Sequence, residues 1–165
     1  IIDESDSDLQ SCARALDLGY RGVSSKNCKG PFKSVLNAGL IWNRNGRGSR
    51  NDFVMTGEDL CTVGAVSVQS DLCLVAALGL EHVEKNGHHF MPGLEYLPTE
   101  DQQAALASHS DFYEAQGDSV GPRIENGCFQ INSINSSGYG FEVVPDIEQW
   151  TAAGSWDFST LGLEE

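Results

Sequence analysis

The order of strand-like and helix-like segments in residues 1–97 constrains the fold of this chain most strongly. Strands are expected at residues 1–2, 20–26, 53–56 and 80–84, and helices at 9–18, from 31 to about 42 or 44, and at 62–78. Alternation at about twenty to thirty residues per unit is typical of βα units whose strands form a parallel sheet. The sequence therefore predicts an α/β fold in which helices cover the outside of the sheet.

Apolar residues at helical spacing support the first two predicted helices. For the first two helices these residues are Leu9, Ala13 and Leu16, then Phe32, Val35, Leu36 and Leu40.

Residues 98–165 differ in character from the first part. A helix is predicted over 98–109, because Thr99 and two acidic residues stand in its first turn. A hairpin is predicted over 123–131, since Asn126-Gly127 is a strong two-residue turn signal. We therefore divide the chain into the alternating units of 1–97 and a helix, hairpin and tail over 98–165 that pack on them.

The charge balance limits the partners of this protein. The chain has 24 acidic and 10 basic side chains, which gives a formal net charge of −14. Such a polyanion repels phosphate backbones, which argues against nucleic acid. The apolar runs are too short to span a bilayer, and five cysteines without paired spacing are typical of free thiols in a reducing compartment. We expect a cytoplasmic protein without nucleic-acid or membrane partners.

Polar side chains gather where the expected strands end, which is where chemistry collects in parallel α/β folds. They are Asp3 and Glu4, then Lys26, then Glu58 and Asp59, then His88 and His89. Carboxylates from separate strand ends suit magnesium, whereas the same residues could form a solvated turn that caps the next helix. Burial of Lys26 could lower its pKa until it works as a base near neutrality, and an exposed lysine at the sheet edge is an equal alternative.

Two short motifs resemble the enolase superfamily, in particular its mandelate racemase and muconate lactonizing group. They are the piece IIDES at the start of the chain and the strand that ends in SSKNCKG. The resemblance implies that the chain is the C-terminal half of a TIM-like (β/α)7β barrel, strands five to eight, with a tail that returns to the capping domain. Gly30-Pro31 stands where the group has a double glycine, and the resemblance leaves the first four strands outside this chain.

The resemblance also implies a site. Asp3 would be a ligand of Mg²⁺ with Glu4 as a second candidate, and Lys26 would be the catalytic lysine. Glu58 would be a second catalytic residue, bordering the carboxylate of the substrate. Lys29, His88 and His89 would contact the substrate at the mouth of the barrel.

The implied activity is removal of a proton α to the carboxylate of a small molecule, by an isomerase or lyase such as a racemase, epimerase, acid-sugar dehydratase or cycloisomerase. The full-length parent is expected to form a homo-oligomer. The half-barrel alone is expected to be inactive and to self-associate through its unpaired sheet edges. Two alternatives stay open: a non-enzymatic α/β binding module, and a zinc hydrolase that uses His88 and His89.

Overall fold

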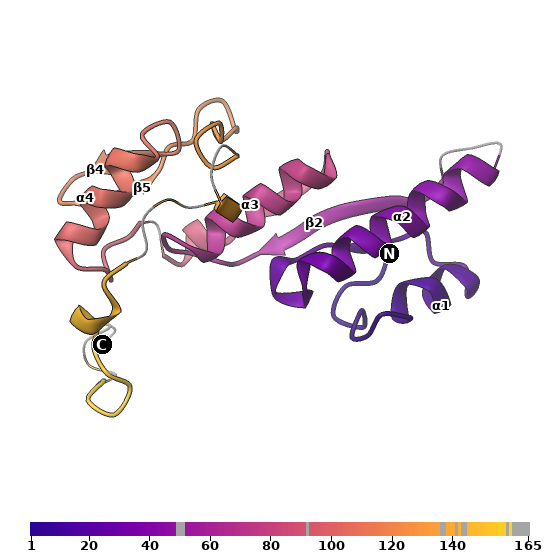
Figure 1. Ribbon diagram of the computed structural model, residues 1–165, viewed down its shortest axis with the longest axis horizontal. Coiled ribbons are helices and arrows are strands. Elements are labelled where there is room, and N and C mark those ends of the chain that lie inside the picture. Colours follow the sequence, from indigo (N-terminus) through magenta and orange to yellow (C-terminus); the bar gives the residue numbers. More distant parts are fainter. Residues whose placement is uncertain are drawn as a thin grey trace.

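The computed structural model describes residues 1–48, 52–91, 93–135, 138–140, 142, 145–157 and 159. It has a mixed α/β fold with one small parallel and one small antiparallel sheet (Figure 1). The α-helices are α1 (Ser11–Asp17), α2 (Pro31–Arg47), α3 (Ser67–Leu78) and α4 (Thr99–Ser108). The strands are β1 (Gly22–Ser24), β2 (Val54–Leu60), β3 (Val83–Lys85), β4 (Tyr113–Gln116) and β5 (Ser119–Pro122). Short 3-10 turns are η1 (Asn27–Lys29), η2 (Gly87–His89), η3 (Gly138–Gly140) and η4 (Ile147–Gln149).

The alternating order predicted for the first part is confirmed. Strands β1, β2 and β3 pair in parallel and in sequence order. Ile2 extends this order, because its N–H donates to Gly22 O and its carbonyl accepts from Ser24 N–H, both at 2.9 Å. All four positions therefore run in the same direction, and their carboxyl ends meet at one edge of the sheet.

Local signals set several helix boundaries as expected. Pro31 is the first residue of α2, where its missing N–H is harmless. Gly79 ends α3 in the left-handed conformation with φ 62°. Thr99 begins α4, with Glu100 and Asp101 in its first turn.

The inner face of α2 is not its apolar side. Phe32, Val35 and Leu36 are exposed, whereas Leu40 packs against the core. The buried side chains of α2 are Lys33, Ser34, Asn37 and Ile41. Helical periodicity identifies the apolar side of a helix but does not determine which side packs against the rest of the protein. In α2 the side that packs is mostly polar. In α1, Leu16 is buried as one of the apolar residues singled out, whereas Leu9 is exposed and Cys12 and Ala15 are buried as well.

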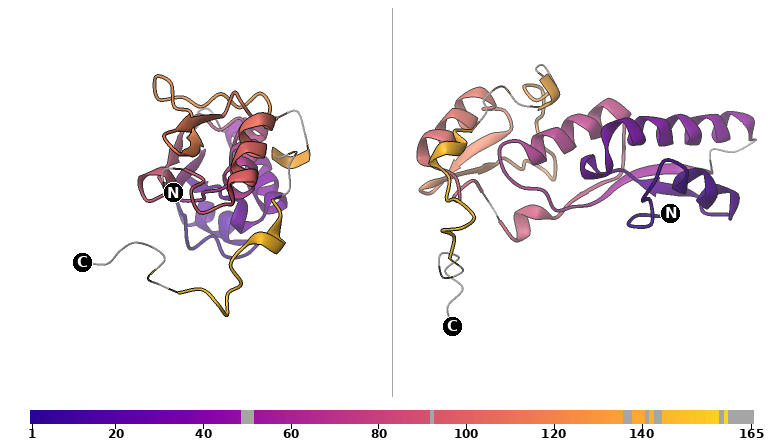
Figure 2. Two further views of the ribbon diagram at one scale, coloured as in Figure 1. Left: turned by 90° about the vertical axis from the view of Figure 1, so that its left-hand side faces the viewer. Right: turned by 60° about the horizontal axis from the view of Figure 1, so that its bottom comes forward.

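Two apolar clusters hold the structure together. The first lies between α1, β1 and α2 and contains Ile2, Cys12, Ala15, Leu16, Val23 and Ile41. The second joins α3 to α4 and the β4–β5 ribbon and contains Ala65, Val68, Leu72, Leu94, Leu97, Ala105, Phe112, Tyr113, Val120 and Ile134. Figures 1 and 2 show α3 between the α2 part of the molecule and the α4–β4–β5 part. The second cluster therefore includes side chains from both sides of the expected division at residue 97.

The C-terminal part has a hairpin that the sequence did not predict. The Asn126-Gly127 turn forms, with φ 53° and 76°, but it closes only a single bridge between Glu125 and Cys128. The paired ribbon is β4–β5, four residue pairs closed by Gly117-Asp118. No helix within the described part of the chain has the length and apolarity that a bilayer crossing requires.

Candidate functional site

The carboxyl ends of the parallel strands form an open cleft, which we call the strand-end cleft. Its lining residues are Glu4, Lys26, Cys28, Lys29, Asp59, Leu60, Cys61, Thr62 and Asp71. The cleft has a volume of about 420 Å³, within the range of small-molecule sites. Most of the residues that the sequence singled out therefore lie at or beside one cleft.

Lys26 is held between two carboxylates. Its Nζ lies 2.9 Å from Asp3 Oδ2 and 3.0 Å from Glu4 Oε1, and its side chain is only 10% exposed. Asp3 follows the Ile2 bridge and Lys26 follows β1, so the parallel pairing of these two segments brings together residues that are 23 positions apart.

The pKa of Lys26 moves in the direction opposite to the one expected from burial. Burial lowers it, but the hydrogen bonds and negative charges of Asp3 and Glu4 outweigh burial and raise the pKa well above its ordinary value. The hypothesis that burial makes Lys26 a base near neutrality is therefore wrong for this arrangement. Asp3 and Glu4 therefore hold Lys26 as an ammonium group.

Lys29 approaches Asp3 from the other side. The η1 turn, in which Lys29 N–H donates to Lys26 O, places both lysines around one carboxylate. Lys29 Nζ lies 2.5 Å from Asp3 Oδ1 and also donates to the carbonyls of Asp3 and Ser24 at 2.8 and 3.2 Å. Burial raises the pKa of Asp3, but bonds from Lys29 and Lys26 outweigh it and lower the pKa below its usual range. The carboxylate of Asp3 is thus ionised and shared.

The end of β2 presents Asp59 to the cleft instead of Glu58. The register of β2 on β3 shifts between Gly57 and Leu60, and Asp59 has φ 50°. The strand therefore forms a bulge, which changes the direction of the side chains at its end. Asp59 Oδ1 accepts from Cys61 Sγ at 3.0 Å and from Asn86 Nδ2 at 3.2 Å. The bond from Cys61 is the largest cause of the lowered pKa of Asp59. Glu58 is partly buried, with its N–H bonded to Ser24 Oγ at 3.1 Å, and its catalytic role stays a prediction.

Asp71 is a site residue that sequence reasoning missed. It is buried in α3, accepts from Asn27 N–H at 2.8 Å, and takes a short hydrogen bond from Thr62 Oγ1. It therefore fixes the η1 turn, and with it Lys26 and Lys29, to the segment after β2. An acidic residue inside an otherwise apolar helical run is the signal that could have found it.

The two histidines follow β3 in the η2 turn. His89 is exposed, and its N–H donates to Asn86 O at 3.0 Å. The side chain of His88 lies outside the described part of the structure. Their predicted contact with a substrate, or with zinc, stays a prediction.

The described residues do not bring together a set of ligands for magnesium. Within the described residues, no three His, Cys, Asp or Glu side chains lie close enough together to hold a metal ion. Each oxygen of the Asp3 carboxylate already meets an ammonium group. Asp3 is thus a single anionic ligand neutralised by two lysines, whereas Mg²⁺ requires a nearly octahedral set of oxygens.

Comparison with known protein families, characterised proteins and solved structures finds no match to this chain.

Proposed function

We propose that this chain is the C-terminal half of a barrel enzyme of the enolase superfamily, of the mandelate racemase and muconate lactonizing type. The enzyme would transfer a proton at the carbon α to the carboxylate of a small molecule, as an isomerase or lyase. The sequential parallel order of Ile2, β1, β2 and β3 supports this proposal, because strands that close a barrel are added one after another in the same direction.

The observation that carries the proposal is the group of Asp3, Lys26 and Lys29 at the carboxyl ends of two adjacent strands. Both ammonium groups lie within 2.9 Å of the Asp3 carboxylate and border an open cleft. A substrate carboxylate has the same chemistry as Asp3, so the cleft can offer it the same donors. We assign Lys29 to binding this carboxylate.

We assign Lys26 the role of proton donor. Its ammonium group is held in the protonated state by Asp3 and Glu4, so it can deliver a proton from Nζ to the α carbon of a bound enediolate. To remove a proton instead, Lys26 must first lose its own, which the two carboxylates oppose. In this chain Lys26 is therefore better suited to return the proton than to take it.

Magnesium belongs to the proposal only through Asp3, with Glu4 as the second candidate ligand. The other ligands would come from residues outside this chain, so the 165 residues alone are not expected to bind Mg²⁺ tightly or to turn over substrate.

The experiment is a deuterium-exchange assay on the protein that carries this chain, with Mg²⁺ supplied in D₂O. A panel of acid-sugar and amino-acid carboxylates is scored for deuterium at the α carbon. Lys26→Arg keeps the positive charge but holds its proton too firmly to exchange it, and we expect a loss of at least about 100-fold in exchange rate. Lys33→Arg is the matched control, because Lys33 also pairs with an aspartate but lies away from the cleft.

Exchange that survives in the Lys26→Arg protein would refute the assignment of Lys26. Carboxylate binding without exchange in the folded wild-type protein would favour a binding module instead of an enzyme.

A further inference from the structure

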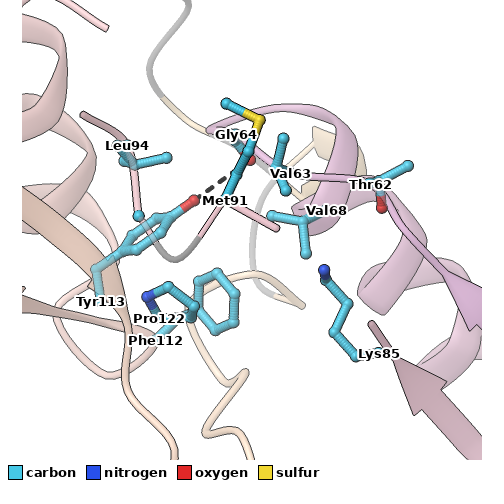
Figure 3. A pocket seen from close by; sticks show the side chains of 11 residues that line it. Thr62, Val63, Gly64, Val68, Lys85, Met91, Leu94, Phe112, Tyr113 and Pro122 are labelled. Atoms are coloured by element: carbon cyan, nitrogen blue, oxygen red, sulfur yellow. Dashed lines mark hydrogen bonds between the residues drawn. The ribbon is translucent and has the colours of Figure 1, made fainter. Parts of the chain in front are cut away.

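Lys85 is the last residue of β3, and its side chain enters a second pocket, separate from the Asp3–Lys26 group. This pocket, which we call the Lys85 pocket, lies between the loop after β2, α3 and the β4–β5 part of the molecule. Its walls near the amine include Val68, Leu94, Phe112 and Tyr113. Figure 3 shows the amine of Lys85 pointing into the pocket between Val68 and Phe112.

Lys85 differs from the other three lysines of the chain in its partners. Lys26, Lys29 and Lys33 each have a carboxylate oxygen within 3.1 Å of Nζ. No carboxylate among the residues that the structure describes lies within ion-pair distance of Lys85. Within the described part of the chain, the fold therefore gives Lys85 no carboxylate counter-ion.

The space around the amine is small and shaped by a glycine. A side chain at Gly87 would place its Cβ 2.4 Å from Lys85 Nζ, so glycine at this position leaves room for the amine. The free volume of the pocket is about 20 Å³, which is enough for one water-sized group. Only a small molecule can reach the nitrogen without a movement of the walls.

The environment favours the uncharged amine. Burial lowers the pKa of Lys85, and electrostatic interactions with Cys61 and Asp71 oppose this effect only in part. An uncharged lysine in an apolar pocket is a nucleophile, whereas an ammonium group is not.

We propose that Lys85 is a nucleophilic lysine that forms an imine with a small aldehyde. The lone pair of Nζ attacks the carbonyl carbon, and the carbonyl oxygen takes up a proton from the nitrogen to give a carbinolamine. This intermediate expels water and leaves a C=N bond to Lys85. The apolar walls favour the unprotonated form of the nitrogen, and a space for one water-sized group selects the one-carbon aldehyde. This inference does not depend on the proposed function of the strand-end cleft.

The test measures the reactivity of all four lysines in the intact chain. The folded protein is treated at pH 7 with limiting formaldehyde and cyanoborohydride, which reduces each imine to a stable methylamine, and the sites are read by peptide mass mapping. We expect Lys85 to be methylated at least about tenfold faster than Lys26, Lys29 or Lys33, because each of those three ammonium groups is bound by a carboxylate, which disfavours the free amine. Lys85→Met identifies the signal that belongs to this residue.

Two further measurements show whether the fold is responsible. In urea the four lysines should react at similar rates, and in the folded protein benzaldehyde should lose the preference for Lys85 that formaldehyde shows. Equal methylation of the four lysines in the folded protein, or a preference for Lys85 that persists in urea, would overturn the proposal.

Discussion

The ion pair between Asp6 and Lys33 explains why the inner face of α2 is polar. Lys33 Nζ lies 3.1 Å from Asp6 Oδ2, and the two side chains are only 9% and 2% exposed. Lys33 also donates to the backbone carbonyl of Asp6, and Asn37 Nδ2 donates to the same carboxylate at 3.1 Å. A buried charge pair therefore fixes the loop before α1 to α2.

Lys33→Met should be strongly destabilising. Methionine fits the volume of the lysine stem, but the substitution leaves the Asp6 carboxylate buried without a cation. Loss of one partner from a buried pair costs about 3–5 kcal/mol, which is a large share of the roughly 5–15 kcal/mol that stabilises a typical domain. Asp6→Asn combined with Lys33→Met removes both charges and should recover most of this loss.

The exposed pair of Arg44 and Asp17 provides the matched control. It joins α2 to α1, as the buried pair joins α2 to the preceding loop, but its side chains are 39% and 67% exposed. Water screens such a pair, so Arg44→Ala should change the free energy of unfolding by less than about 1 kcal/mol.

The assay is urea unfolding at pH 7, followed by far-UV circular dichroism at low micromolar concentration, for the wild-type protein and the three variants. The free energy of unfolding comes from the midpoint and slope of each transition. If Lys33→Met lies within about 1 kcal/mol of Arg44→Ala, or if the double variant is as unstable as Lys33→Met, the argument from the buried charge is refuted.

Three further predictions follow. Burial lowers the pKa of His109 below its ordinary 6.5, so the stability that its neutral ring provides is present above about pH 6.5 and is lost as the pH falls. Urea midpoints measured at pH 7.5 and 5.0 should therefore differ more in the wild-type protein than in the His109→Gln variant. Equal differences in the two proteins would contradict this prediction. Phe32 and Trp42 are 86% and 80% exposed on α2, so the 165-residue chain should self-associate and elute from gel filtration at an apparent mass above its 17.8 kDa. Changing both residues to serine should shift the elution towards that of the monomer. A monodisperse wild-type monomer at micromolar concentration refutes this prediction. Gly140→Ala should destabilise the chain by about 1–3 kcal/mol in thermal unfolding. The reason is that Gly140 has φ 98° and that a Cβ there would lie 2.6 Å from the carbonyl oxygen of Gln69. A change in the free energy of unfolding below about 0.5 kcal/mol would refute the strain argument.

The element order could be predicted from the sequence because its signals are local. The residues Pro31, Gly79 and Thr99 fix a helix start, a helix end and another helix start through their own backbone preferences. The β4–β5 ribbon was missed, since its Gly117-Asp118 turn stands in a polar stretch that lacks the apolar alternation of a strand.

Part of the candidate site could likewise be predicted from the sequence, and part of it could not. That Asp3 and Lys26 lie close together follows from the parallel order of the strands, which the sequence predicts. The placing of Asp59 in the cleft depends on a bulge within β2, and the role of Asp71 depends on how α3 packs against the η1 turn. No local pattern determines either of these contacts.

The sequence by itself determined the α/β class, the order of the elements and the gathering of charged residues at one end of the sheet, because these depend on local periodicity and on chain direction. The tertiary structure decided which stripe of α2 is buried and in which direction the pKa of Lys26 moves. Burial alone would lower that pKa, and only the positions of Asp3 and Glu4 reverse the sign. The charge state of a buried group depends on distances to partners far away in the chain, and those distances exist only once the chain has folded.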